Sequence, residues 1–444
     1  MNKEFQKKQN FFSFSDIDSE RKDRIMKFTS TEATPAPHVP PGVLRLTGAA
    51  KEDIPMYRIQ TMNKISPVGL NRFPSELYEV GDAVQDPQGI LVRSAKLLDL
   101  EFNPSLLAIA RAGVGVNNIP LDRCAAAGIP VFSTPGANAN AVKELVICAM
   151  LMGSRDIPGA IRWVREQAAS GVDVSTVVEK GKSAFIGPEL YKKTLGIIGL
   201  GAIGSIVANT AISLGMDVYG YDPFLSVDTA LRLDRHVHVV KDINDLYKRS
   251  DYITMHIHYT EKTAHMIDAD AIAAMKRGVR VINLARGEIV DDEAMLTALD
   301  TGMVAAYITD FPNNRLLTAP HVIAMPHLGA STPESEQNCA AMAVDTLRDY
   351  LESGNIRSSV NLPEMTMDRS GVQRLCVLHK NVPGMLANIT SLFGRDGVNV
   401  ENLSNKSRGD YAYTMVDLGS KVGDNVIEDV RRTANVIRVR SLEW

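Results

Sequence analysis

The sequence predicts an α/β protein with two doubly wound parallel sheets and a small C-terminal domain of βαββαβ order. From about residue 54 onward, short apolar strands alternate with helices, which is the pattern of βαβ units in a parallel sheet. A glycine-rich strand–loop–helix stretch at 194–215 begins a second series of such units. After residue 371 the order becomes strand, helix, strand, strand, helix, strand, which is ferredoxin-like.

Composition and charge narrow the classes of function. The chain has 444 residues, of which 45% are hydrophobic and 23% charged, and its formal net charge is −4. These values are ordinary for a globular protein, so we expect neither nucleic acid nor a membrane as a partner. The longest apolar run, at 146–152, is too short to span a bilayer. Four cysteines without a CxxC pair predict reduced thiols and a cytoplasmic location.

The first 53 residues are predicted to be a flexible extension and linker. They contain acidic residues but no long apolar core, which argues against a secretory or organellar leader. The stretch TEATPAPHVPPG at 31–42 is rich in proline, as many linkers are. Binding of a partner by this extension is the alternative.

Two series of parallel strands are expected after residue 54. The first has buried strands at 89–94, 105–113 and 129–134, and a long helical region over 138–167 follows. The second has strands at 195–200, 216–222, 252–257, 279–285 and 304–310. A helix over 333–352 comes next, and its return to the first sheet would place a cleft between two domains, outside the carboxyl ends of the strands.

The glycine stretch GLGAIG has the features of a dinucleotide site. Gly199 allows a tight turn, Gly201 lets the backbone approach a pyrophosphate, and Gly204 permits close packing of helix on sheet. The next strand ends at Asp222, 18 residues after Gly204 (222 − 204), where a carboxylate can accept both ribose hydroxyls. A carboxylate there repels a 2′-phosphate, so NAD is expected rather than NADP. A glycine turn with a surface aspartate is the structural alternative.

Two later stretches carry groups that oxidation of a 2-hydroxy acid requires. A cation must hold the substrate carboxylate, and the planar guanidinium of Arg286 in INLARGEIVDDEAM can do so in bidentate fashion. A base must take the hydroxyl proton as the hydride leaves, and His327 in MPHLGAST is suited to this. Either residue alone would be read as a surface charge or a structural group. The fixed order of the three stretches favours a nicotinamide-dependent dehydrogenase.

From about residue 55 to its C-terminus, the chain resembles the D-2-hydroxyacid dehydrogenase family. The motifs that carry the resemblance are RSA at 93–95, RAGVGVNNI at 111–119, GLGAIG, NLARGEIVD at 283–291 and PHLGAST at 326–332. The chain is similar in particular to members that oxidise 3-phospho-D-glycerate to 3-phosphohydroxypyruvate, the first step of L-serine biosynthesis.

The resemblance implies a domain organisation. Two Rossmann-like domains are expected, with an NAD-binding domain at 151–326 inserted into a substrate-binding domain formed by 54–150 and 327–357. A linker at 358–371 and a regulatory ACT domain at 372–444 complete the expected order.

The resemblance also assigns roles to residues. Arg286 is expected to bind substrate, and His327 to act as acid and base. Contacts with NAD are implied for Gly199, Gly201, Ala202, Ile203, Gly204, Asp222, Ile257, Leu284, Ala285 and Asp310. Contacts with substrate are implied for Arg93, Ser94, Gly115, Val116, Asn138 and Lys143. Arg93 is the candidate for phosphate binding, while Lys143 either adds a phosphate contact or is only a solvated helix charge.

Three positions depart from the family pattern. The family pairs its catalytic histidine with an upstream glutamate, but here Arg315 stands about there, and Asp310 is the nearest carboxylate upstream of His327. We therefore expect that Asp310 or an acid from elsewhere in the fold assists His327, or that His327 acts unassisted. His258 and Pro120 replace a usual proline and a usual aspartate, and both are expected to be tolerated loop changes.

The C-terminal segment resembles an ACT domain through LHKNVPGMLANITSLFGRDGVNV at 378–400. The positions that contact the ligand in serine-binding ACT domains are held here by His379, Asn381 and Asn399. The resemblance implies L-serine as an inhibiting effector at an interface between two ACT domains, in a homodimer or homotetramer. A purely structural dimerisation domain is the alternative.

Other functions stay open from sequence. A relative that acts on glyoxylate, hydroxypyruvate or another 2-hydroxy acid is one, and a cationic phosphate subsite argues against it. An NAD-sensing binding protein is another, and the presence of both catalytic groups argues against that. The pairs His236/His238 and His256/His258 have no third ligand nearby, so no metal site is expected.

Overall fold

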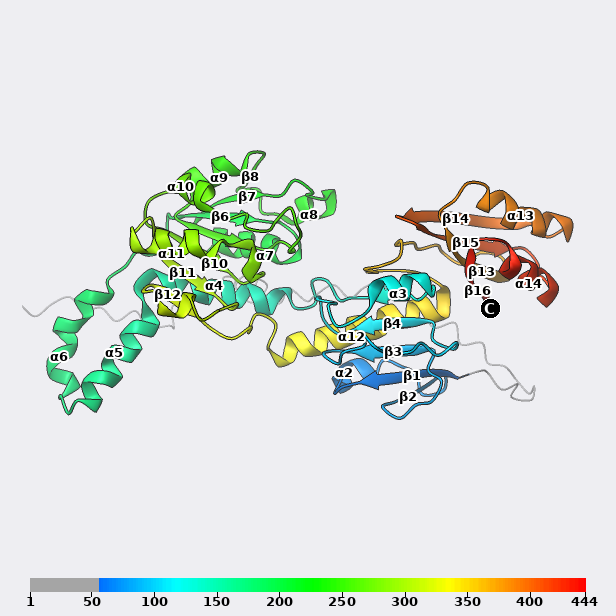
Figure 1. The fold of residues 1–444 in the computed structure, drawn as a ribbon, viewed down its shortest axis with the longest axis horizontal. Coiled ribbons are helices and arrows are strands. Elements are labelled where there is room, and N and C mark those ends of the chain that lie inside the picture. The colour runs from blue at the N-terminus through cyan, green and yellow to red at the C-terminus, as the bar shows by residue number, and fades with distance from the viewer. Residues whose placement is uncertain (1–55) are drawn as a thin grey trace, which may run out of the picture. The chain divides into compact units, whose positions relative to one another are not determined.

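The computed structural model describes residues 56–444 (Figure 1). The extension predicted at 1–53 lies outside the described residues. Two of the described sheets are parallel throughout, and the third, near the C-terminus, is antiparallel. The predicted α/β class is therefore confirmed, as is the strand and helix order of its small C-terminal domain. No helix within 56–444 combines the length and apolar character that a membrane span needs.

The first parallel sheet has the strand order β2-β1-β3-β4-β5. Its strands are β1 (Tyr57–Met62), β2 (Tyr78–Gly81), β3 (Gly89–Val92), β4 (Ala108–Arg111) and β5 (Val131–Phe132), with short helices α2 (Pro67–Leu70) and α3 (Leu121–Ala126). β3 and β4 are almost wholly buried, as their apolar sequences predict. The later helix α12 (Pro333–Ser353) packs on β3, β4 and β5, so the chain returns to this sheet.

The second parallel sheet has the order β12-β11-β10-β9-β6-β7-β8. Its strands are β6 (Thr194–Ile198), β7 (Asp217–Tyr221), β8 (Val237–Val240), β9 (Tyr252–Met255), β10 (Val279–Asn283), β11 (Val304–Thr309) and β12 (Val322–Ala324). The helices between them are α7 (Ala202–Ser213), α8 (Val227–Arg232), α9 (Ile243–Arg249), α10 (Ala269–Ala273) and α11 (Asp292–Asp300). Consecutive residues Ile197 and Ile198 belong to different apolar clusters, because successive side chains of a strand point to opposite faces. Both faces of this sheet are therefore covered.

The region predicted as helical over 138–167 is helical, but it is divided into two helices. α4 (Ala139–Arg155) ends at Asp156, which has a left-handed φ of 41°, and α5 (Ile157–Ala169) starts directly after it. The Asp156 carboxylate accepts a hydrogen bond from the backbone of Gly159, 3.0 Å away, and Pro158 lies in the first turn of α5. An N-cap aspartate followed by proline is a helix start, which accounts for the break.

Helix α4 spans the predicted domain boundary at 150/151. Its buried residues Val142, Val146, Ala149 and Met150 join the apolar cluster of the second parallel sheet. The boundary itself stays a prediction. α6 (Val174–Gly181) and the 3-10 turn η1 (Lys182–Phe185) follow α5 and pack against it.

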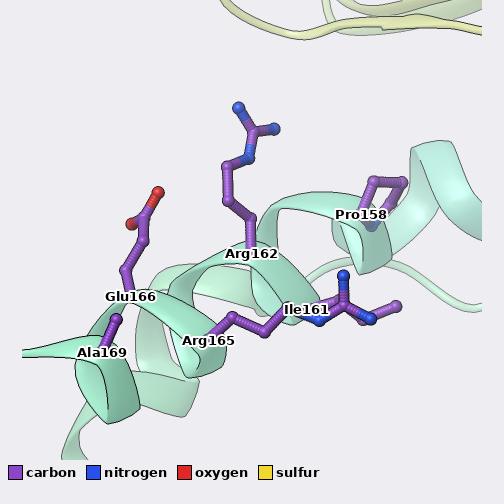
Figure 2. Close-up of a pocket in the computed structure, with 6 residues that line it drawn as sticks. All are labelled: Pro158, Ile161, Arg162, Arg165, Glu166 and Ala169. Carbon is purple, nitrogen blue, oxygen red and sulfur yellow. The ribbon is translucent and has the colours of Figure 1, made fainter.

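A shallow hollow of about 370 Å³ lies along α5. The residues that line it are Pro158, Ile161, Arg162, Arg165, Glu166 and Ala169, drawn in Figure 2. All of them come from one helix, and none belongs to the predicted site. We therefore treat this hollow as a surface groove and not as an active-site cavity.

The C-terminal domain is an antiparallel sheet of order β14-β15-β13-β16 with two helices. Its elements are β13 (Gln373–Lys380), α13 (Met385–Arg395), β14 (Val400–Arg408), β15 (Tyr411–Leu418), α14 (Asp424–Arg432) and β16 (Val436–Glu443). This is the βαββαβ order that the sequence predicts.

The carbonyl end of α12 is enclosed by side chains of this antiparallel sheet. Arg440 donates hydrogen bonds to the carbonyl oxygens of Tyr350 (3.1 Å) and Leu351 (2.9 Å). The Tyr413 hydroxyl donates to the carbonyl of Gly354, at 2.7 Å. Arg440 thus serves the Leu351 carbonyl in the last turn of the helix, where carbonyls commonly lack backbone partners, while the Tyr350 carbonyl also accepts from the backbone N–H of Gly354.

A buried ion pair stands beside this helix end. Arg374 and Asp417 are both fully buried, with two N–H···O contacts of 2.5 and 2.7 Å between guanidinium and carboxylate. Arg374 also donates to the carbonyl of Ser353, at 2.8 Å. The pair therefore links the antiparallel sheet to the C-terminal end of α12.

Candidate active site

The glycine loop between β6 and α7 has the geometry that a pyrophosphate site needs. Gly199 has a left-handed φ of 90°, and a Cβ there would lie 2.6 Å from the carbonyl oxygen of His256. A Cβ at Gly204 would lie 1.9 Å from the carbonyl oxygen of Gly199, so only glycine fits. A Cβ at Gly201 meets nothing within 4 Å, and no side chain caps the N-terminus of α7. An open, uncapped helix N-terminus favours a bound phosphate group.

Asp222 follows β7 at the edge of this loop. One carboxylate oxygen accepts from the backbone N–H of Leu200 (2.9 Å), and the other accepts from that of Phe224 (2.8 Å). These bonds fix the carboxylate beside the glycine loop and leave each oxygen with a further lone pair. The residues present therefore fit a ribose diol, and they disfavour a 2′-phosphate by charge repulsion.

Five other expected cofactor residues lie at the ends of elements in the second sheet. Ala202 and Ile203 begin α7, and Ile257 follows β9 by two residues. Leu284 and Ala285 follow β10, with Leu284 buried. All five lie at the carboxyl edge of the sheet, where the crevice of a doubly wound fold binds its ligand.

His256 was not singled out for this site, although it lies against the glycine loop. Its Nε2 lies 3.2 Å from the hydroxyl of Thr254, while its Nδ1 is buried without a hydrogen-bond partner in residues 56–444. Burial lowers the pKa of His256 to about 4. The imidazole is therefore neutral at physiological pH. Its position directly after a buried strand was the signal that could have found it.

Arg286 is held by the turn that follows β10. The buried amide of Asn283 donates to the carbonyl of Arg286 (2.8 Å) and accepts from the backbone N–H of Ala285 (3.2 Å). The Arg286 guanidinium donates to the carbonyl of Ala285, at 2.6 Å. Asn283 was missed as a positioning residue, although it begins the motif that contains Arg286.

Phe311 joins Arg286 and His327. The guanidinium carbon of Arg286 lies 5.6 Å from the centre of the Phe311 ring, and the His327 ring centre lies 4.6 Å from it. The two predicted catalytic groups therefore contact one aromatic ring, although they come from loops after different strands. Phe311 was not predicted, and its place directly after Asp310 at the end of β11 was the available signal.

Asp310 lies under the loop that carries His327. Its side chain is 1% exposed, and one oxygen accepts from the backbone N–H of Gly329, at 3.2 Å. Its other oxygen is buried without a hydrogen-bond partner among the described residues. Burial raises the pKa of Asp310, and the neighbouring His327 and backbone amides offset this only in part. Asp310 thus bonds to the backbone of the histidine loop, while its effect on the imidazole is electrostatic.

The position of the missing glutamate is filled by a surface charge. Arg315 makes an exposed ion pair with Glu293 at 3.5 Å. Within residues 56–444 no carboxylate is hydrogen-bonded to the His327 ring, because Asp310 bonds only to the backbone of its loop. Among the described residues, Asp310 is the carboxylate that interacts with His327, through charge and through the backbone of its loop.

Two more arginines stand at the carboxyl ends of strands in the first sheet, Arg93 directly after β3 and Arg111 as the last residue of β4. A Cβ at Gly115 would lie 3.3 Å from a guanidinium nitrogen of Arg286, so the loop after β4 and Arg286 are in close approach. Arg111 donates from Nε to the carbonyl of Arg93, at 3.0 Å. The guanidinium of Arg93 itself is paired with Glu336 on α12, at 2.5 Å. Sequence reasoning assigned no role to Arg111 or Glu336.

The remaining expected substrate residues are less closely gathered. Ser94 is exposed and Val116 half-buried, each in the loop after its strand. Asn138 precedes α4, and its Oδ1 is buried without a partner in the described part of the chain. Lys143 donates to Asn140 (2.7 Å) and approaches Glu144 (3.8 Å), so its contacts are with its own helix.

The three expected serine ligands do not meet within one chain. The residue before Asn381 pairs with Tyr411 at the start of β15, whereas the residue after Asn399 pairs with Leu418 at its end. The two asparagines are therefore at opposite ends of the sheet. His379 is 2% exposed, with its ring nitrogens 2.8 Å from the carbonyl of Lys380 and 2.8 Å from the hydroxyl of Thr414.

By fold and by the geometry of its site, the chain is a dinucleotide-binding protein of the dehydrogenase class. Residues 147–329 match the family described as D-isomer specific 2-hydroxyacid dehydrogenase, NAD binding domain. Over 379 residues the chain is 31% identical to D-3-phosphoglycerate dehydrogenase of Haemophilus influenzae, which covers 82% of this chain and 88% of that protein. The chain therefore belongs to the D-2-hydroxyacid dehydrogenase family and carries its NAD-binding domain.

Two further comparisons place the chain within this family. It is 36% identical over 326 residues to D-3-phosphoglycerate dehydrogenase of Synechocystis, covering 71% of this chain but only 56% of that relative's length. The crystal structure of NAD+-bound 3-phosphoglycerate dehydrogenase from Entamoeba histolytica aligns with a TM-score of 0.54 and 26% identity, over 69% of this chain and 99% of that one.

Proposed function

We propose that the chain oxidises 3-phospho-D-glycerate to 3-phosphohydroxypyruvate with NAD+, as the first step of L-serine biosynthesis. The observation that carries the proposal is the contact of Arg286 and His327 with one ring, Phe311, beside the loop of Gly115. The names of the relatives support the phosphorylated substrate.

In this proposal Arg286 holds and orients the substrate. Its planar guanidinium binds the substrate carboxylate with two hydrogen bonds and polarises the developing carbonyl at C2. Asn283 fixes the turn from which Arg286 projects, through the bond to the Arg286 carbonyl. Phe311 packs against the guanidinium and restricts it further.

His327 then accepts the hydroxyl proton of the substrate as its C2 hydride leaves. Bound NAD+ supplies the hydride acceptor for this step. The C2–H and O–H bonds break, a C=O bond forms, and the proton moves to the imidazole, which releases it to solvent. Asp310, below the loop of His327, assists in this proposal by stabilising the protonated imidazole through space when its carboxyl is ionised.

An alternative substrate class has one specific observation in its favour. Arg93, the expected phosphate ligand, is neutralised by Glu336. A site with this carboxylate suits an unphosphorylated 2-hydroxy acid, as in reductases of glyoxylate or hydroxypyruvate. Both candidates use Arg286 and His327 in the same way, so the distal subsite distinguishes them.

The test is NADH formation from D-3-phosphoglycerate, with D-glycerate and D-lactate assayed in parallel. We expect kcat/KM to be highest for the phosphorylated acid. Preference for an unphosphorylated acid would transfer the assignment to the second class. NAD binding without turnover of any acid, in either direction, would favour a sensing protein instead.

We also propose that the C-terminal domain is an ACT domain that binds L-serine between two copies of the chain. Asn381 and Asn399 lie at opposite ends of one sheet, so a ligand that contacts both needs Asn381 from one copy and Asn399 from the other. His379 would have to release Thr414 or the Lys380 carbonyl before it could bind serine. A homodimer or homotetramer follows from this arrangement.

Calorimetry with L-serine tests this regulatory site. Serine should bind to the wild-type protein and reduce turnover, and Asn381→Ala should weaken both effects at least tenfold. Asn388→Ala, on the exposed part of α13, is the matched control. Absence of serine binding, or inhibition that survives Asn381→Ala, would reduce the C-terminal domain to a structural role.

A further inference from the structure

Glu336 stands between α12 and the expected substrate site. It lies in the first turn of α12, which begins after the His327 loop with Thr332 as its N-cap. Its carboxylate contacts the Arg93 guanidinium at 2.5 Å, and both side chains are about half exposed (44% and 43%). An ion pair of this exposure contributes little to stability and can open at small cost.

Arg93 belongs to a group of three neighbouring guanidiniums. Arg111 bonds to the Arg93 carbonyl and flanks the loop that approaches Arg286. Burial lowers the pKa of Arg111, and the nearby charges of Arg286 and Arg93 lower it further. Within residues 56–444 neither Arg111 nor Arg286 has a carboxylate in ion-pair contact, so Glu336 is the one acidic partner of the three.

The three guanidiniums carry more positive charge than the single carboxylate of Glu336 can balance. Like charges this close destabilise one another, and an anion that enters the group relieves the repulsion. A 2-hydroxy acid with a distal phosphate brings one carboxylate for Arg286 and a phosphate for Arg93 and Arg111. In the absence of such an anion, Glu336 occupies the Arg93 guanidinium.

We propose that Glu336 is a specificity-determining residue that competes with the substrate phosphate for Arg93. This inference rests on the proposed function for the identity of the substrate. Binding of a phosphomonoester breaks the Arg93–Glu336 ion pair, the phosphate takes its place, and Arg111 supplies the second cation. The Glu336 carboxylate therefore lowers the affinity for phosphorylated acids, because part of their binding free energy is used to break the Arg93–Glu336 ion pair.

The substitution Glu336→Gln tests the competition, because glutamine keeps the shape of the side chain and removes its charge. We expect selectivity, the ratio of kcat/KM for D-3-phosphoglycerate to that for D-glycerate, to rise about three- to tenfold, which corresponds to the strength of one exposed ion pair that the phosphate no longer has to break. The change should lie in KM for D-3-phosphoglycerate and not in kcat. In an Arg93→Ala background, the same substitution should leave KM unaffected, because the two charges then no longer compete.

Asp345→Asn is the matched control. Asp345 lies on the same helix and makes a similar exposed pair with Arg72 at 2.6 Å, away from the three guanidiniums. This variant should keep the wild-type selectivity. Unchanged or reduced selectivity in Glu336→Gln, or an increase that persists without Arg93, would overturn the proposal.

Failure of the proposed function is distinguishable from failure of this inference. If the wild-type protein oxidises neither acid, calorimetric titration with inorganic phosphate in the presence of NADH replaces the kinetic assay. Tighter phosphate binding by Glu336→Gln than by wild type would then support the competition. Equal or weaker binding would contradict it.

Discussion

The two ends of helix α12 lie beside ion pairs that differ in their exposure to solvent. At the N-terminal end, the Arg93–Glu336 pair is about half exposed, and the neighbouring Arg111 has no acidic partner among the described residues. At the C-terminal end, Arg374 and Asp417 are fully buried and joined by two short hydrogen bonds. An exposed ion pair therefore involves the first turn of the helix, whereas a buried pair of the antiparallel sheet holds its last turn through the bond of Arg374 to the Ser353 carbonyl.

The difference in burial between the two ion pairs indicates a different role for each end of α12. A buried pair is costly to break, because removal of one partner leaves an uncompensated charge, so it fixes the position of the helix. An exposed pair is weak and can yield to a ligand. Since α12 follows the His327 loop directly, its anchored end supports the candidate site, and we propose that its other end responds to anions.

The largest effect is expected at the site end. His327→Ala should lower kcat for D-3-phosphoglycerate about 10²- to 10⁴-fold, the usual contribution of a general base. NADH affinity, measured by fluorescence titration, should stay near the wild-type value because the glycine loop is intact. Turnover within tenfold of wild type would mean that another group takes the proton.

The anchored end should respond in stability. Asp417→Ala leaves the buried Arg374 without its carboxylate and should lower the free energy of unfolding by about 3–5 kcal/mol in a urea titration. The double variant Arg374→Met, Asp417→Leu should recover much of this loss, because no buried charge remains unpaired. A loss below about 1 kcal/mol for Asp417→Ala, the size expected for an exposed pair, would contradict the claim that the buried pair is the stronger of the two.

A smaller effect, dependent on pH, is expected from His256 beside the glycine loop. Its folded-state pKa of about 4 is below the ordinary 6.5, so its neutral form favours folding above pH 6.5. This contribution is lost as pH falls from 6.5 toward 4, by at most about 3 kcal/mol for a shift of this size.

Asp310 acts with the opposite sign. Its pKa is raised in the folded protein, so protonation on acidification favours the folded state. Urea titrations of wild type and His256→Asn across pH 4–7 separate the two groups. The variant should lose less stability on acidification, and parallel pH profiles would show that His256 is not the group responsible.

The smallest effect is expected for an exposed pair of α12 outside the site. Asp345→Asn removes its contact with Arg72 and should change the free energy of unfolding by less than about 1 kcal/mol. Thermal or urea unfolding is sufficient to measure it. A loss comparable with that of Asp417→Ala would mean that exposure does not decide the strength of these pairs.

Sequence patterns predicted the inner strands of the second parallel sheet, because buried strands such as β6 and β10 are rich in apolar residues. In the first sheet they predicted β3, β4 and β5 but missed β1, an inner strand that is buried only at Ile59. They did not predict the edge strand β12, which is short and only partly buried. The break at Asp156 could have been foreseen, since DIPG combines an N-cap residue with a proline. The break was missed because the residues on both sides of Asp156 favour helix.

The site was predictable where chemistry follows a local motif. Gly204 tolerates no side chain, because a Cβ there would clash with the carbonyl of Gly199 in the same loop. The position of Asp222 beside the loop was predictable because it directly follows the next strand. The Arg93–Glu336 pair joins residues 243 positions apart, and no local pattern contains such a contact. Phe311 likewise acquires its role only when two loops meet around its ring.

The central claim is hydride transfer from C2 of a phosphorylated 2-hydroxy acid to NAD+. The most direct measurement uses D-3-phosphoglycerate deuterated at C2, with mass spectrometry of the NADH that forms. The account predicts NADH that carries the deuterium, together with 3-phosphohydroxypyruvate that has lost it, and no such product from His327→Ala on the same timescale. NADH without the label, or no NADH from this substrate while another 2-hydroxy acid is oxidised, would contradict the account.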